Sequence, residues 1–224
     1  MRAALVTGGS SGIGLAIARM LREEGFELTL AARTPEKLEA AAAELGAHAV
    51  AANVADDAEC ERIVREHASR FGRLDVLVNS AGIGIASALE DLSTKRWDLQ
   101  FAVNVRAAFV VIREAIPMLR ESKGTVVNLA SIAGTIPTPS LVAYAASKAG
   151  MISMTRTLNR ELEDDGVRVC AICPGFVDTA MASWTGMSSD EMIQPEDCAE
   201  VVRLLLRLSP RARIPQVVIE RLGE

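Results

Sequence analysis

The sequence lacks any apolar run long enough to cross a membrane, and it has no block of like charge. A transmembrane helix needs about 20 apolar residues in succession, and no window of the chain approaches that length. The apolar start, residues 1–6, runs directly into a glycine-rich stretch and is too short for a signal peptide. Lysine and arginine are scattered and the formal net charge is -5, so nothing marks a nucleic-acid or anionic-membrane surface. We therefore expect a cytoplasmic protein with neither kind of partner.

Cysteine and histidine are also scarce. Of the four cysteines, Cys170 and Cys173 form a CxxC pair, a spacing that marks redox or zinc sites in other proteins. The surrounding residues have the pattern of a strand, in which positions i and i+3 point to opposite faces, so the two thiols should diverge. No second CxxC and no HxxxH pair completes a zinc site. We predict no disulfide framework, no metal, and no general-base role for His48 or His67.

The chain does have a regular alternation of short apolar runs and helical stretches. Seven runs have the β-branched pattern of strands buried on both faces: 2–7, 27–32, 47–52, 74–79, 124–130, 167–173 and 215–220. Six helices are predicted between them: 14–24, 36–45, 57–71, 95–121, 141–164 and 195–208. Five helices are followed by a residue suited to a left-handed cap: Gly25, Gly46, Gly72, Gly124 and Gly166.

This alternation predicts an α/β fold: a Rossmann-type doubly wound parallel sheet of about seven strands with helices on both faces. No repeat or linker divides the chain, so residues 1–224 are expected to form a single domain. The least regular stretch, residues 178–194, is too long for an ordinary connection and is interpreted as a mobile flap. Sheets of this kind bind ligands beyond the carboxyl ends of their strands.

A glycine-rich loop joins the first strand to the first helix. It reads Thr7-Gly8-Gly9-Ser10-Ser11-Gly12-Ile13-Gly14. Glycines allow a pyrophosphate to approach the backbone closely, and the helix amino terminus offers free N–H groups. The loop matches neither GxGxxG nor a P-loop. A simple turn is the alternative, but the position in the first strand–helix unit favours a dinucleotide site.

The end of the second strand should decide which adenosine ribose is bound. An acidic residue at this point would hold the 2′-hydroxyl of NAD and repel a 2′-phosphate. Here Ala32 is followed by Arg33, and a guanidinium can bind a phosphate through paired charge-assisted bonds. The alternative is a solvated arginine at a helix start, where a cation is not otherwise favoured. The sequence predicts NADP(H), with NAD(H) as the less favoured cofactor.

Tyr144 and Lys148 lie four residues apart in a predicted helix and so share one face. An ammonium beside a phenol lowers the phenol pKa from about 10 towards neutrality, which makes tyrosine a usable acid and base. Ser131, at the carboxyl end of a predicted strand, can hydrogen-bond a substrate oxygen. Tyrosine and lysine on one turn are usually surface neighbours, but Tyr144 is the only tyrosine in the chain.

Several motifs recur in the order and spacing of a known family: Thr7-Gly8-x-x-x-Gly12-x-Gly14, Asn79-Ser80-Ala81-Gly82, Asn104, Ser131, Tyr144-x-x-x-Lys148 and Pro174-Gly175 with Thr179. Over essentially its whole length the sequence resembles a short-chain dehydrogenase/reductase. The resemblance implies a catalytic tetrad of Asn104, Ser131, Tyr144 and Lys148. In these roles Tyr144 transfers the proton, and Lys148 binds the nicotinamide ribose and lowers the tyrosine pKa. Ser131 orients the substrate oxygen, and Asn104 anchors a water of the proton relay.

The resemblance also implies a set of cofactor-binding residues, in which Thr179 and the backbone of Val177 would hold the carboxamide. The set is Gly8, Ser10, Ser11, Gly12, Ile13, Gly14, Arg33, Asn53, Val54, Asn79, Ala81, Gly82, Tyr144, Lys148, Pro174, Gly175, Val177 and Thr179. Three positions depart from the family pattern. Ser80 replaces an asparagine, Asn53 replaces the aspartate near the adenine, and Ser10-Ser11 stand where NADP-preferring relatives often have a basic residue.

The predicted function is an NADP-dependent oxidoreductase of CH-OH groups, acting on a small or medium carbonyl/alcohol pair. Residues 194–197 and 214–220 are similar to the NADP-dependent 3-hydroxy acid dehydrogenase branch, but too loosely to fix the substrate. The alternatives are an idle dinucleotide-binding sensor or scaffold, and a dehydratase or epimerase. The intact tetrad favours the dehydrogenase. Mostly apolar residues are expected to line the substrate pocket: Ile83, Ala133, Pro137, Leu141, Phe176, Met181 and Trp184.

The two long helices predict a homodimer or homotetramer. Residues 107–111 form a continuous apolar run, and Met151, Ile152, Met154 and Leu158 extend beyond one stripe. A monomer would expose these faces as a large apolar patch, which pairing with symmetry mates would bury, as is common in the resembled family. The alternative is that loops of the same chain cover them.

Overall fold

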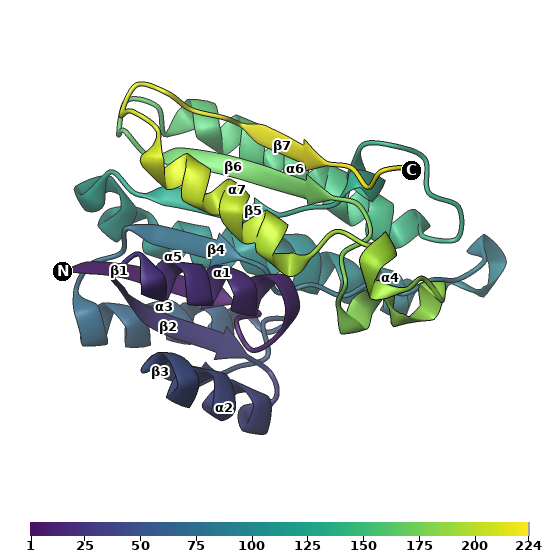
Figure 1. Ribbon diagram of the computed structural model, residues 1–224, viewed down its shortest axis with the longest axis horizontal. Helices are drawn as coiled ribbons and strands as arrows, with labels where there is room; N and C mark the ends of the chain where they lie inside the picture. Colours follow the sequence, from purple (N-terminus) through teal and green to yellow (C-terminus); the bar gives the residue numbers. More distant parts are fainter. Residues whose placement is uncertain (224) are drawn as a thin grey trace.

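The computed structural model describes residues 1–223 and builds them around one parallel sheet (Figure 1). Its strands are β1 (Arg2–Thr7), β2 (Phe26–Ala32), β3 (His48–Ala51), β4 (Val76–Asn79), β5 (Thr125–Leu129), β6 (Arg168–Pro174) and β7 (Gln216–Ile219). The order is β3-β2-β1-β4-β5-β6-β7, with every neighbouring pair parallel. The chain runs outward to β3 and then crosses back to β4, so the strand order reverses between β1 and β4. The predicted fold class is confirmed.

Helices cover both faces of the sheet (Figure 1). They are α1 (Gly12–Glu23), α2 (Pro35–Leu45), α3 (Asp57–Phe71), α4 (Thr94–Phe101), α5 (Ala107–Ser122), α6 (Val142–Glu161) and α7 (Pro195–Arg207). Buried side chains of α1, α2 and α7 pack on one face, and those of α3, α5 and α6 pack on the other. Because each strand is covered twice, neighbouring residues such as Ala4 and Leu5 enter different cores, which explains the unbroken apolar runs.

The CxxC pair follows this alternation. Cys170 lies in the core beneath α1 and α7, whereas Cys173 lies in the core beneath α6. All four cysteines are buried and free, and burial raises the pKa of each thiol. The prediction of diverging structural thiols is confirmed.

The predicted helix at 95–121 is wrong in one respect, because it is interrupted. Between α4 and α5 the backbone forms a π-helical turn, Ala102–Arg106. Such turns are rare and often lie at functional sites. This one contains Asn104, whose side chain is fully buried and bonded to a neighbouring loop. Those tertiary contacts are not visible in helical periodicity.

The cap predicted at Gly124 is also wrong, because Lys123 takes the left-handed conformation with φ 52°. Gly124 is required for space instead. A Cβ at this position would lie 2.8 Å from Leu119 Cδ2 and 2.9 Å from Asp75 O. At Gly46 and Gly72 the predicted left-handed caps are present, with φ of 60° and 62°.

The predicted flap, residues 178–194, contains two short 3₁₀ helices, Ala180–Thr185 and Ser189–Glu191. Its base is closed by a bridge between Val177 and Ile193. There the Asp178 amide donates to Ile193 O at 2.9 Å, and the Ile193 amide donates to Phe176 O at 3.0 Å. The segment therefore has a fixed base, and its mobility stays a prediction.

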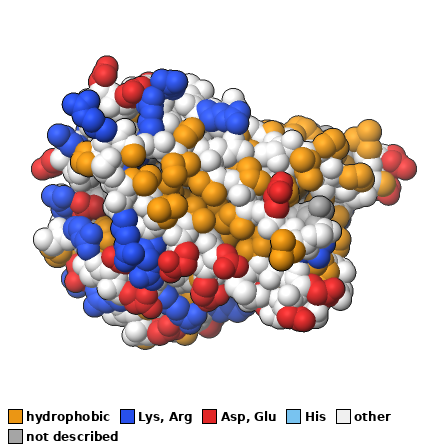
Figure 2. Space-filling model, turned by 45° about the horizontal axis from the view of Figure 1, so that its top comes forward, with side chains coloured by type: hydrophobic (Ala, Val, Ile, Leu, Met, Phe, Trp, Pro, Cys, Tyr) orange, Lys and Arg blue, Asp and Glu red, His pale blue; other side chains and the backbone are white. Residues whose placement is uncertain are grey.

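The expected all-round apolar surface of residues 107–111 is wrong. Only Phe109 is exposed, at 48%, because the other four residues pack against the sheet, α3 or α6 within the same chain. Exposed apolar side chains occur instead at the β7 edge, with Leu204 of α7 at 52% and Val218 at 43%. Figure 2, which brings that edge forward, shows hydrophobic side chains gathered over the middle of this face.

His67 is a structural residue rather than a base. Its ring is fully buried, with Nδ1 2.8 Å from Thr29 Oγ1 and Nε2 2.9 Å from Arg73 O. The carbonyl can only accept, so Nε2 donates to it and Nδ1 accepts from the threonine hydroxyl.

Among the helices of residues 1–223, none has both the length and the apolar character of a membrane span.

Candidate active site and dinucleotide groove

Two adjoining cavities open beyond the carboxyl ends of the strands. The first has a volume of about 360 Å³ and contains the predicted catalytic residues Ser131, Tyr144 and Lys148, and the second has about 390 Å³ and contains the glycine loop. Five residues line both cavities: Ile13, Ser80, Gly82, Thr179 and Met181. They form one continuous site around the point where the strand order reverses.

The glycine loop is shaped by contacts that exclude side chains. Gly8 has φ +70°, and a Cβ there would lie 2.7 Å from Ala81 N. A Cβ at Gly14 would lie 2.3 Å from Gly8 O, so Gly14 packs the loop onto α1 and lines neither cavity. The helix begins at Gly12 with no side-chain cap and no acidic residue in its first turn. Its free amides therefore remain available to an anion in the second cavity.

The far end of the second cavity is lined by Arg33, Asn53 and Val54. Arg33 is exposed and makes no hydrogen bond or ion pair with any part of the chain that the structure describes. No carboxylate among the described residues lines this cavity. The end of β2 therefore presents an uncompensated positive charge to a ligand. Asn53 accepts a hydrogen bond from the Ala55 amide at 3.2 Å through Oδ1, so its oxygen already holds the loop in place.

Asn79 supports the groove from behind. Its Nδ2 donates to Asn128 Oδ1 at 2.9 Å, and Asn128 Nδ2 donates to Thr155 Oγ1 at 2.9 Å. This buried chain ties the ends of β4 and β5 to α6. Asn79 lines neither cavity, so it lies beneath the groove, and its contact with a cofactor stays a prediction.

Ser131, Tyr144 and Lys148 meet in the first cavity, as their spacing predicts. Ser131 follows β5 and accepts a hydrogen bond from the Ala133 amide at 3.2 Å. Tyr144 and Lys148 come from the first turns of α6. Pro174, Gly175 and Val177 line the same cavity from the end of β6.

The expected lowering of the Tyr144 pKa by Lys148 is wrong for the described geometry. Burial raises the pKa of Tyr144, and the Ser131 hydroxyl is the group that opposes this effect. Lys148 Nζ donates to Leu129 O at 2.6 Å and lies 5.6 Å from the centre of the tyrosine ring. Burial also lowers the pKa of Lys148 to about 8. The ammonium thus donates to a main-chain carbonyl while it also lies over the face of the tyrosine ring.

Asn104 lies behind the cavities rather than in them. Its Nδ2 donates to Ile83 O at 2.9 Å and to Ser147 Oγ at 3.0 Å, and its Oδ1 accepts from the Ile83 amide at 2.9 Å. Ser147 in turn donates to Tyr144 O at 2.7 Å. Asn104 therefore holds the wall of the groove and reaches the tyrosine through Ser147. The sequence analysis missed Ser147, because nothing in the local pattern distinguishes it from other helical serines.

The walls of the first cavity are mostly apolar. Six of the seven predicted pocket residues line it: Ala133, Pro137, Leu141, Phe176, Met181 and Trp184. The seventh, Ile83, lines the second cavity instead. Sequence reasoning missed Ile136 and Pro139, which lie in a loop without periodicity. Lys148 is the only charged residue in this lining among the residues described.

Within residues 1–223, no group of three or more His, Cys, Asp or Glu side chains is arranged to hold a metal ion.

Comparisons with known proteins agree with this geometry. A family model described as short chain dehydrogenase matches residues 2–188. An uncharacterized oxidoreductase of Staphylococcus aureus strain MW2 is 36% identical over 220 residues, covering 96% of this chain and 95% of that protein. An uncharacterized oxidoreductase of Staphylococcus epidermidis strain ATCC 35984 is 33% identical over 221 residues, covering 97% and 96%.

Two solved structures are similar over nearly their full lengths. One is an alcohol dehydrogenase from the archaeon Thermococcus sibiricus complexed with 5-hydroxy-NADP, with a TM-score of 0.92, 30% identity, and coverage of 100% of this chain and 98% of that one. The other is a 3-ketoacyl-(acyl-carrier-protein) reductase from Brucella melitensis complexed with NADH, with a TM-score of 0.91, 28% identity, and coverage of 98% and 96%.

Proposed function

The chain belongs to the short-chain dehydrogenase family and is an oxidoreductase, and from that premise we propose that it transfers a hydride between NADP(H) and a neutral, largely apolar carbonyl/alcohol substrate. The observation that carries the proposal is the continuity of the two cavities. A hydroxyl-lined chamber with apolar walls adjoins a groove that ends at an unpaired arginine.

The residues present fit a dinucleotide. The glycine loop leaves no room for side chains where the pyrophosphate would lie, and α1 presents its uncapped amino terminus. Arg33 would bind the 2′-phosphate of the adenosine ribose, with Ser10 and Ser11 nearby in the same lining. The absence of a lining carboxylate among the described residues favours NADP(H) over NAD(H). The two structural relatives named above carry one cofactor of each kind, so the preference rests on Arg33.

When bound, NADP(H) would supply or accept the hydride at the substrate carbon. Tyr144 supplies the proton in the direction of carbonyl reduction, because its raised pKa keeps the phenol protonated at neutral pH. Ser131 lines the same cavity and orients the substrate oxygen. Lys148, held by Leu129, places a positive charge beneath this region. Asn104 keeps the groove wall and α6 in register through Ile83 and Ser147.

The substrate cavity disfavours a carboxylate. Among the described residues its one lining cation is Lys148, which is buried and gives one of its three N–H donors to a main-chain oxygen. An ionised acid would therefore be desolvated against mostly apolar walls with this single cation as its partner, which is costly. We also propose that the enzyme is cytoplasmic and homo-oligomeric, with a small-molecule substrate and neither nucleic acid nor membrane as a partner.

The test is a comparison of initial rates with NADPH and NADH over aldehydes, ketones and 3-hydroxy acids. A 3-keto acid and its methyl ester form a pair that differs in charge and by one methyl group. We expect turnover with NADPH and at least a tenfold higher kcat/KM for the ester. A preference for the free acid would refute the substrate class, and no turnover with any carbonyl or alcohol would refute the function.

A further inference from the structure

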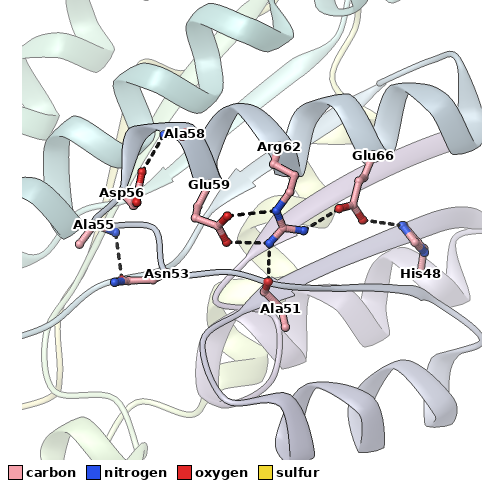
Figure 3. Close-up of polar contacts among 9 residues, drawn as sticks. All are labelled: His48, Ala51, Asn53, Ala55, Asp56, Ala58, Glu59, Arg62 and Glu66. Carbon is pink, nitrogen blue, oxygen red and sulfur yellow. Dashed lines mark hydrogen bonds and ion pairs between the residues drawn. The ribbon is translucent and has the colours of Figure 1, made fainter.

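The loop between β3 and α3 contributes Ala52, Asn53 and Val54 to the far end of the second cavity. This loop, residues 52–56, is held by short-range contacts of its own. The Asp56 amide donates to Asn53 O at 3.0 Å, and the Ala55 amide donates to Asn53 Oδ1 at 3.2 Å. Figure 3 shows the second of these contacts at the start of α3. These bonds fix the shape of the loop but not its position relative to the rest of the site.

Arg62 of α3 ties the loop to its own neighbouring elements. Its Nη2 donates to Ala51 O, the last residue of β3, at 2.6 Å. Glu59 and Glu66 flank the same guanidinium, and Glu66 also lies 3.5 Å from His48 Nε2 (Figure 3). All of these residues belong to β3 or α3, so this network joins the two elements that flank the loop.

Arg106 makes a contact of a different kind, because it comes from the π-helical turn between α4 and α5. Its Nη2 donates to Ala55 O at 2.9 Å, and its Nε forms an ion pair with Asp57 at 2.9 Å. Within residues 1–223, it is the only side chain from outside β3 and α3 that hydrogen-bonds a residue of loop 52–56. The first residue of the loop is also held by the main chain, because the Ala52 amide donates to Ala32 O at 2.9 Å. Arg106 is the side chain that joins the loop to the π-helical turn.

The same turn reaches the rest of the site. Val103 lines the second cavity, and Asn104 holds the amide and the carbonyl of Ile83. Asn104 also contacts Ser147, which is bonded to the backbone of Tyr144. The turn therefore makes three contacts. Arg106 bonds to Ala55 at the adenosine end of the groove, and Asn104 bonds to Ile83 in the groove wall and to Ser147 below Tyr144.

We infer that Arg106 is a positioning residue that couples binding at the adenosine end of the groove to the placement of Asn104. The inference rests on the proposed function in that a nucleotide must bind the second cavity. A ligand that contacts Asn53 and Val54 fixes the position of loop 52–56, and Arg106 transmits that constraint to the π-helical turn. Coupling between sites of this kind changes affinities by about fivefold or more.

The probe is 2′,5′-ADP, which has the adenosine and the 2′-phosphate but no nicotinamide. Its Kd and the hydrogen exchange of the Ile83 and Ile85 amides are measured for wild type, Arg106→Ala, Arg106→Lys and Arg113→Ala, at equal fractional occupancy. Arg113 is the matched control: it is similarly exposed and joins α5 to Glu61 of α3 but does not touch the loop. Because the Arg106 ion pair is also exposed, its loss is expected to be tolerated by the fold.

In wild type and Arg113→Ala, the probe should slow exchange of the Ile83 amide by about fivefold or more. In Arg106→Ala the Kd should rise by about five- to twentyfold and the slowing should vanish, with Arg106→Lys between the two. Wild-type affinity and wild-type protection in Arg106→Ala would overturn the coupling while leaving the proposed function intact. Failure of wild type to bind both 2′,5′-ADP and NADPH would instead overturn the proposed function, and the coupling with it.

Discussion

The side-chain nitrogen of Lys148 donates to the main-chain oxygen of Leu129 at 2.6 Å, while the centre of the Tyr144 ring lies 5.6 Å away. The lysine is therefore anchored to Leu129, which is the last residue of β5 and lies two residues before Ser131. Burial lowers its pKa to about 8 from 10.5. The folded enzyme thus maintains a charged lysine at neutral pH against a desolvation cost.

That cost predicts a pH-dependent stability difference between wild type and Lys148→Met. A shift from 10.5 to about 8 corresponds to about 3 kcal/mol. Above pH 8 the folded state loses a proton that the unfolded state keeps, so the wild type gains stability relative to the variant up to pH 10.5. Urea unfolding at pH 7, 9 and 10.5 measures this gain. Lys37→Met, at an exposed lysine, should show a constant difference, and a constant difference for Lys148→Met would contradict the prediction.

Tyr144→Phe should abolish turnover and leave NADPH binding nearly unchanged. The hydroxyl is the proposed proton donor, whereas the ring packs in the same way in both proteins. Loss of a positioned acid typically costs about 10²- to 10⁴-fold in rate. Single-turnover rates together with the Kd for NADPH separate the two effects. Near-normal turnover would exclude Tyr144 as the acid.

Replacing Ala32 with Asp and Arg33 with Ala should reverse the cofactor preference. The new carboxylate would bind the 2′-hydroxyl of NADH, and the lost guanidinium removes a charge-assisted phosphate contact worth roughly 1.5–3 kcal/mol, or about a 10- to 150-fold loss of NADPH affinity. Titration of the double variant and of wild type with NADPH and NADH gives the ratio of the two Kd values for each protein. Equal binding of the two cofactors by wild type would reduce Arg33 to a surface residue.

His67 should make the enzyme sensitive to acid. Burial lowers the pKa of His67 to about 4 from 6.5, which corresponds to about 3 kcal/mol. Because the folded-state pKa is the lower one, this stability is present above pH 6.5 and is lost progressively as the pH falls to 4. Unfolding of wild type and His67→Gln should therefore converge between pH 6.5 and 4. Parallel curves would show that His67 does not titrate on unfolding.

The oligomeric state should depend on the β7 edge. Leu204 and Val218 are exposed there, and an edge strand offers unpaired backbone groups. Light scattering is expected to give two or four times 23.9 kDa for wild type. Leu204→Glu should lower that mass, and Phe109→Ser should not. A wild-type mass near 23.9 kDa would refute the pairing.

The elements predictable from sequence are those whose signal is local. Strands buried on both faces leave unbroken apolar runs, and glycine caps follow the helices, so element bounds agree with expectation to within a few residues. The meeting of Ser131, Tyr144 and Lys148 also follows from spacing, because each lies at the carboxyl end of the sheet.

The features that escaped prediction depend on contacts between distant segments. Lys148 of α6 donates to Leu129 O of β5, and the left-handed residue after α5 is Lys123, while Gly124 is kept as glycine by the closeness of Leu119 and Asp75. The apolar run at 107–111 is covered by the chain itself. Periodicity records that a side chain is apolar, but not which neighbour covers it.

The π-helical turn at Ala102–Arg106 has a consequence for how this helix tolerates length changes. A π turn holds one residue more than an α turn needs, so deleting a residue here would regularise the helix at little cost to its backbone bonding. Because the extra residue is taken up within the turn, α4 and α5 would keep their mutual orientation, but the residues inside the turn would change their directions. Asn104 and Arg106 could no longer face Ile83 and Ala55 together. A regular α-helix at this point would therefore lose the contacts of Asn104 with Ile83 and of Arg106 with Ala55.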